Sequence, residues 1–117
     1  LREHRVFVTA GAAGGKRRPQ ALEVTDLAEV THDPLLASLR QRLRRDHGAP
    51  RQGPIGLRCV FSRESVHAPQ GDGAECRTDG SLNCAGYGSS VMVTASFGLA
   101  TAAAVVEAAL HRRKAML

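Results

Sequence analysis

The segment from Val91 to His111 constrains the fold more than any other, because it is apolar on nearly every side. A helix without a polar face must be covered all round, so the segment predicts a long buried helix over residues 91–111. Its length approaches that of a membrane span, but burying Glu107 in lipid is costly, and we therefore expect no membrane contact. The segment is rich in alanine, a strong helix former: Ala95, Ala100, Ala102, Ala103, Ala104, Ala108 and Ala109.

The size and core composition of the chain predict one domain that depends on further contacts. A chain of 117 residues with 43% hydrophobic residues can bury a single core. Only four side chains are aromatic and none is Trp, so Leu, Val and Ala must build a thin core, which yields little net stability. Because the sequence also begins with Leu1, we expect residues 1–117 to be a segment of a longer protein.

Three strand-like segments and one helix are expected before residue 62. Residues 5–10 form a strand that stops at the glycine-rich run 11–15, and residues 57–61 form an apolar strand after a loop with two prolines and two glycines. Residues 21–30 form a further strand-like stretch. Asp33 followed by Pro34 predicts the start of an amphipathic helix over residues 33–47, which Gly48 ends. The apolar stripe of this helix comprises Leu35, Leu39 and Leu43, widened by Leu36.

The run Gly11-Ala12-Ala13-Gly14-Gly15-Lys16 resembles a phosphate cradle, but its details do not fit. The Walker pattern needs four residues between its first Gly and Gly-Lys, and then a Ser or Thr. Here only three residues separate Gly11 from Gly15-Lys16, and Arg17 follows. The dinucleotide fingerprint needs a helix after the glycines, and a strand is expected instead. The run is therefore interpreted as a plain loop, and we expect no cofactor-binding residue in this segment.

Residues 62–90 are polar and glycine-rich, which predicts a long flexible loop with Cys76 and Cys84 inside it. Cys84 precedes a helix start, where the helix dipole could stabilise a thiolate, so it is a candidate nucleophile as well as an ordinary small apolar residue. Cys59 lies in an apolar strand and is expected in the core. No Cys-x-x-Cys pair for zinc is present, and three cysteines suit a reduced, cytoplasmic setting.

The formal net charge of +5 favours an anionic partner, and nucleic acid is the leading candidate. Two basic clusters are candidate RNA-binding sites: the end of the first helix with Arg40 and Arg44, and the tail with Arg112, Arg113 and Lys114. The helix dipole alone also favours cations at a helix C-terminus, so both clusters have a purely structural explanation.

Several motifs resemble, in this order, the C-terminal part of the tRNA threonylcarbamoyladenosine dehydratases, members of the ThiF/MoeB/HesA-like adenylating family. The matching stretches are residues 24–28, 33–35, 39–43 and 59–62, Pro69-Gln70 with Asp72-Gly73, Cys76, Cys84-Ala85, and residues 92–98. The resemblance implies an α/β fold whose ATP-binding half is absent here, leaving a few strands and two main helices. Residues 6–15 would then form a late strand of the nucleotide-binding sheet and its exit loop.

The same resemblance implies the function. Such enzymes use ATP, with magnesium, to activate the carboxylate of threonylcarbamoyladenosine beside the tRNA anticodon and then close it to a cyclic product. It further implies a homodimer, a possible monovalent cation whose ligands cannot be placed on this sequence, and a possible link to a sulfur-acceptor or desulfurase system. Cys84 matches the crossover-loop cysteine of the wider superfamily only loosely, and the segment alone is expected to be inactive.

Two other classes of function remain open on the sequence alone. A freestanding basic RNA-binding or interaction module would also explain the charge, and a membrane-tethered interaction domain would explain the apolar helix. An in-frame glycine-rich nucleotide loop upstream of Leu1 would favour the enzyme, whereas a start codon beside Leu1 would favour the free module.

Overall fold

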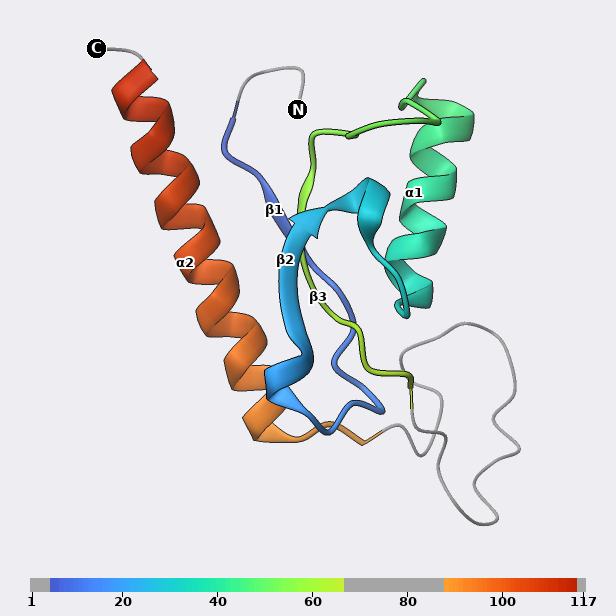
Figure 1. Cartoon of the computed structure of the whole chain (residues 1–117), viewed down its shortest axis with the longest axis vertical. Helices are drawn as coiled ribbons and strands as arrows, with labels where there is room; N and C mark the ends of the chain where they lie inside the picture. The colour runs from blue at the N-terminus through green and yellow to red at the C-terminus, as the bar shows by residue number, and fades with distance from the viewer. Residues whose placement is uncertain (1–4, 67–87, 116–117) are drawn as a thin grey trace.

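The computed structural model describes residues 5–66 and 88–115, which form a small mixed sheet between two helices. The strands are β1 (Val8–Ala10), β2 (Leu22–Asp26) and β3 (Arg58–Ser62), and the helices are α1 (Pro34–Asp46) and α2 (Val91–Ala115). Short 3-10 turns, Pro19–Ala21 and Leu27–Glu29, flank β2. Figure 1 shows α1 and α2 on opposite sides of the strands. This arrangement of three strands and two helices is the α/β class that the sequence predicts.

The central strand β3 organises the sheet, whose order is β1-β3-β2. It pairs in parallel with β1, where Thr9 faces Cys59, and antiparallel with β2, where Val24 faces Val60. Successive side chains of a strand point to opposite faces of the sheet. Accordingly, Cys59 and Phe61 pack on the α1 side and Val60 packs on the α2 side. From Cys59 to Ser62, β3 is therefore buried on both faces of the sheet.

The α1 side holds the larger of the two hydrophobic clusters. Its buried members are Leu27, Val30, Leu36, Leu57, Cys59 and Phe61. Helix α1 begins as predicted, because the Asp33 carboxylate accepts from the amide of Leu36 at 2.9 Å and Pro34 occupies the first turn. It also ends as predicted, with Gly48 at φ +68°.

Three expectations about the ends and faces of these elements are wrong in detail. Leu35 is 44% exposed and the inward stripe runs through Leu36, Leu39 and Leu43, because the cap at Asp33 sets the rotation of the first turn. β2 stops at Asp26, whose carboxylate caps the turn after it, so residues 27–30 are not strand. Only residues 8–10 of the predicted 5–10 strand pair with β3.

The prediction that the C-terminal helix is buried all round is also wrong. Among the side chains of α2 that the structure describes, residues 91–113, only Val93, Phe97 and Ala104 are buried, and they lie on the stripe that faces the sheet. Leu99 is 74% exposed and Val106 58% exposed, because a three-stranded sheet covers one side of a helix and nothing else described packs on the others. The stretch Val91–Arg113 is long and apolar enough to cross a membrane by length and composition, a test that the core helices of soluble proteins also pass.

Candidate nucleic-acid interface

The glycine-rich loop after β1 is a structural joint, and its lysine points inward. Lys16 is buried, and its ammonium group donates to the carbonyl oxygens of His32 at 2.8 Å, Ser62 at 3.1 Å and Glu64. Burial lowers the pKa of Lys16, while the carboxylates of Asp33 and Glu64 oppose this shift. An ammonium group with three carbonyl partners is not available to a phosphate, which supports the plain-loop interpretation of residues 11–16.

Asp33 connects this loop to the start of α1. One carboxylate oxygen accepts from the amide of Leu36 and the other accepts from the amide of Ala12 at 2.9 Å. A side chain at Gly11 would overlap this carboxylate, so the close approach requires glycine at that position. Gly15, at φ +75°, then turns the chain, and its amide donates to the carbonyl of Gly88 just before α2. The loop therefore fixes the N-terminal ends of both helices beside the carboxyl ends of β1 and β3.

Asp26 forms a second joint, at the opposite end of the sheet. Its carboxylate accepts from the amides of Ala28 at 2.9 Å, Ile55 at 2.8 Å and Gly56 at 2.7 Å. Partial burial raises the pKa of Asp26, but the backbone amides together outweigh it and hold the pKa below its ordinary value. Asp26 thus ties the loop of residues 49–56, which follows α1, to the end of β2.

The candidate nucleophile cannot be placed in this arrangement. Cys84 and Cys76 lie outside the described residues, as does most of the predicted loop 62–90. Cys59 lies on the central strand β3, which has β1 on one side and β2 on the other, and it is fully buried. Burial raises the pKa of its thiol to about 12. A thiol that stays protonated in the core is not a nucleophile, so Cys59 is a core residue, as predicted. Within residues 5–66 and 88–115 no group of His, Cys, Asp or Glu could hold a metal ion.

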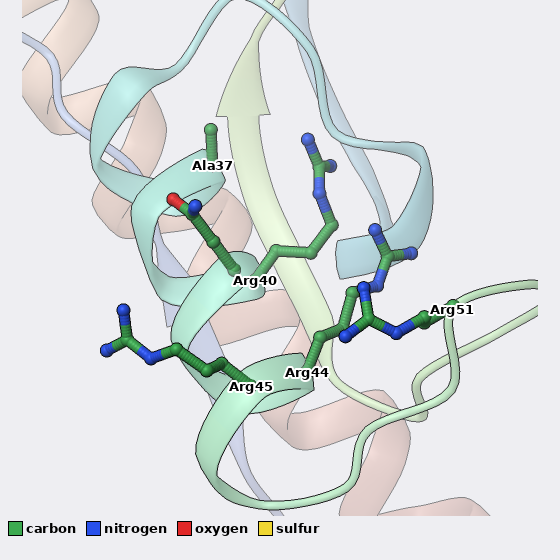
Figure 2. Close-up of a pocket in the computed structure, with 6 residues that line it drawn as sticks. Ala37, Arg40, Arg44, Arg45 and Arg51 are labelled. Atoms are coloured by element: carbon green, nitrogen blue, oxygen red, sulfur yellow. The ribbon is translucent and has the colours of Figure 1, made fainter.

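The first predicted basic cluster surrounds a hollow of about 390 Å³ on the outer side of α1. Figure 2 shows the arginine side chains that line it, three from α1 and one, Arg51, from the following loop. Arg44 donates from Nε to the carbonyl of Pro50 at 3.0 Å. Arg40 donates from Nη1 to the carbonyls of Leu27 and Val30, so part of its role is to hold α1 against the preceding turn.

The second predicted basic cluster lies at the end of α2. Arg112 and Arg113 are exposed in its final turns, and the helix continues through position 114. In Figure 1 both helices run in the same direction, so their C-terminal ends lie at the same end of the molecule, on opposite sides of the sheet. The fold brings Arg40 and Arg44 together with Arg51, but it separates them from Arg112 and Arg113 by the sheet.

No family model matches the chain, but sequence and structure comparisons find the same enzyme. The tRNA threonylcarbamoyladenosine dehydratase of Escherichia coli (strain K12) is 44% identical over 101 residues, 79% of this chain and 38% of that protein. The protein of the same name from Haemophilus influenzae is 34% identical over 110 residues, 91% of this chain and 41% of that protein. The solved structure of the E. coli enzyme, TcdA, in complex with AMP superimposes with a TM-score of 0.70 at 37% identity and covers 92% of this chain.

The chain matches part of the tRNA threonylcarbamoyladenosine dehydratases. It spans about two fifths of the length of these dehydratases. Another structure of the E. coli dehydratase is a complex with ATP, with a TM-score of 0.69 and 35% identity over 92% of this chain. The resemblance noted in the sequence is therefore confirmed, both in sequence and in fold.

Local sequence patterns do not single out two of the residues that shape these sites, Arg51 and Lys16. Arg51 was counted only as part of a loop, although a basic residue directly after a basic helix end is a visible signal. Lys16 was weighed only as a phosphate ligand, because no local pattern shows that its partners are carbonyls at positions 32, 62 and 64.

Proposed function

We propose that this chain is the C-terminal part of an ATP-dependent tRNA threonylcarbamoyladenosine dehydratase that acts beside the tRNA anticodon. The observation that carries the proposal is the agreement of two comparisons: 44% identity to a dehydratase over 79% of the chain, and a TM-score of 0.70 to the solved enzyme over 92% of it. The failed phosphate motif supports the view that the ATP site lies in the part of the protein that the chain does not include.

The proposed reaction removes one water in two steps. The threonine carboxylate of the modified nucleoside attacks the α-phosphorus of ATP, pyrophosphate leaves, and an acyl-adenylate forms. The neighbouring carbamoyl group then attacks the activated carbonyl carbon, a proton is lost, and AMP leaves as the ring closes. The E. coli dehydratase has been solved in complex with ATP and in complex with AMP, the nucleotides that this reaction would consume and release. Magnesium would neutralise the phosphates of ATP.

Within the complete polypeptide, this chain would supply a basic surface for tRNA. Arg40, Arg44, Arg112, Arg113 and Lys114 are the proposed RNA-binding residues, because cations that neutralise backbone phosphates release counterions and dominate affinity. Cys84 is the proposed catalytic residue, on its position before a helix start in the sequence and on its loose match to the crossover-loop cysteine of the superfamily. We further propose a cytoplasmic homodimer with no membrane contact, a possible monovalent cation, and a possible link to a sulfur-acceptor or desulfurase system.

The test uses the complete natural polypeptide that contains this sequence. It is incubated with tRNA that carries threonylcarbamoyladenosine, with and without ATP, and the nucleosides are then analysed by mass spectrometry. The proposal expects a product lighter by one water that depends on ATP, together with release of AMP and pyrophosphate. Binding of tRNA without any conversion of the modified nucleoside would instead favour a basic RNA-binding module.

A further inference from the structure

The hollow beside α1 combines a concave surface with an unusual density of positive charge. Its lining is Ala37, Arg40, Gln41, Arg44, Arg45 and Arg51, so four of six lining residues are arginines and none is acidic. Arg45 is the least available of the four, because it forms a two-point pair with Asp46 at 2.9 and 3.1 Å. Figure 2 shows its side chain directed away from those of Arg44 and Arg51.

Arg44 and Arg51 face the same part of the hollow, and the backbone holds one of them in place. The bond from Arg44 Nε to the Pro50 carbonyl fixes this side chain beside the residue that precedes Arg51. The terminal nitrogens of Arg44 point to no carbonyl or carboxylate among the described residues, and Arg51 has no hydrogen bond or ion pair there. The Asp26 contacts to Ile55 and Gly56 anchor the far end of the loop that carries Arg51.

Two guanidinium groups that share a hollow without a carboxylate repel one another, and a bound anion would relieve this repulsion. Guanidinium groups match the oxygens of a phosphate with paired hydrogen bonds. The lining contains no aromatic side chain on which a base could stack and no glycine-rich turn that could surround a nucleotide. The chemistry of the hollow therefore suits a phosphodiester of a polynucleotide backbone better than a free nucleotide.

We propose that this hollow binds a backbone phosphate of tRNA, with the side chains of Arg44 and Arg51 as the donors. The proposal rests on the proposed function and deepens it by naming one phosphate site and a residue, Arg51, in it. Of the RNA-binding residues proposed above, Arg40 takes an indirect part in this site: it lines the hollow, and its Nη1 bonds to the carbonyls of Leu27 and Val30 hold α1 in place, so it is a positioning residue. A phosphate contact of this kind orients the tRNA and reads no sequence.

The experiment compares single variants of the complete polypeptide by the salt dependence of tRNA affinity, measured by fluorescence anisotropy. Arg51→Ala removes one donor from the hollow, and its exposed side chain has no structural bond to lose. Arg42→Ala is the matched control, since it removes one exposed charge from the neighbouring helix α1, outside the hollow. Arg51→Lys keeps the charge but loses the paired hydrogen bonds.

Arg51→Ala is expected to weaken tRNA binding about fivefold at moderate salt and to reduce the slope of log affinity against log salt by about one. Arg44→Ala combined with Arg51→Ala should reduce the slope by about two, while Arg51→Lys should keep the slope and lose part of the affinity. Arg42→Ala should change affinity by less than about twofold, and ATP affinity should stay unchanged in all variants.

Three results would overturn the site and leave the proposed function intact. They are an unchanged affinity and slope in Arg51→Ala, an equal loss in Arg42→Ala, which would indicate a diffuse basic surface, and a loss of ATP affinity in place of tRNA affinity. A wild-type polypeptide that converts no modified nucleoside and binds no tRNA would refute the proposed function, and the site with it.

Discussion

Replacement of Lys16 by Met tests whether the glycine-rich loop is a structural joint or a phosphate site. The substitution keeps a long apolar stem and removes the ammonium group, which leaves the carbonyls of His32, Ser62 and Glu64 without their donor. The Ser62 bond is fully buried, whereas the other two are partly buried and water can replace the lysine there. We expect the free energy of unfolding to fall by about 1–3 kcal/mol, since one buried acceptor without a partner costs about that much and the apolar contact that Met regains offsets part of the cost at the two wetter carbonyls.

The loss should appear as a lower urea midpoint of the complete polypeptide at neutral pH, followed by circular dichroism. Arg17→Met is the matched control, because it removes a neighbouring charge whose side chain is exposed, and it should change stability by less than about 0.5 kcal/mol. The affinity for ATP, extrapolated to the folded protein, should be the same in both variants. A Lys16→Met variant with unchanged stability and weakened ATP binding would refute the structural role.

Three further predictions concern the Asp26 joint, the nucleotide and the tail. Asp26→Asn should cost about 1–2 kcal/mol near neutral pH, because the charge that accepts three backbone amides is lost, while Asp46→Asn should leave the unfolding midpoint nearly unchanged. The folded pKa of Asp26 is lowered, so its contribution to the free energy of unfolding is present above its unfolded pKa and is lost as the pH falls through the folded pKa. Urea midpoints of the wild type and Asp26→Asn that differ equally at every pH would contradict this. The isolated chain should show no ATP binding by calorimetric titration, and micromolar affinity would sink that expectation. Neutralising Arg112, Arg113 and Lys114 together should weaken tRNA binding and reduce the slope of log affinity against log salt by up to about three. Turnover on saturating tRNA should be less affected. Unchanged affinity and slope would mean that these cations are only favoured by the dipole at the helix end.

Local signals in the sequence predict those parts of the fold that depend on local chemistry. The start of α1 follows from the capping oxygen of Asp33 and the fixed φ of Pro34, and its end follows from the positive φ of Gly48. The core position of β3 follows from its three successive apolar residues, Cys59, Val60 and Phe61. These features need only a few neighbouring residues, and all of them are confirmed.

Features that depend on distant partners could not be predicted in this way. Lys16 meets carbonyls that are 16, 46 and 48 positions away, and no periodicity reveals such contacts. The predicted burial of α2 is too high, because apolar composition shows that a helix needs cover but not where that cover comes from. The described residues cover only the side with Val93 and Phe97. The exposed Leu99 and Val106 are consistent with a chain that spans about two fifths of the dehydratases it matches.

In the hollow beside α1, too, the sequence shows the charge cluster but not the contacts between residues that are distant in the chain. Arg40 and Arg44 were identified from a charge cluster, but their different roles come from the carbonyls that each one contacts. Arg51 joins them only because the loop after α1 folds back along the helix, where Arg44 bonds to Pro50.

A chimera tests the central claim most directly. The segment of the E. coli dehydratase that matches this chain, 38% of that enzyme, is replaced by the present sequence, and the purified chimera is incubated with ATP and tRNA that carries threonylcarbamoyladenosine. The account predicts that the chimera binds ATP, because the rest of the enzyme is intact, and that mass spectrometry detects the nucleoside with one water removed. A chimera that folds and binds ATP but neither binds the tRNA nor dehydrates it would contradict the claim that this chain is the tRNA-facing part of such an enzyme.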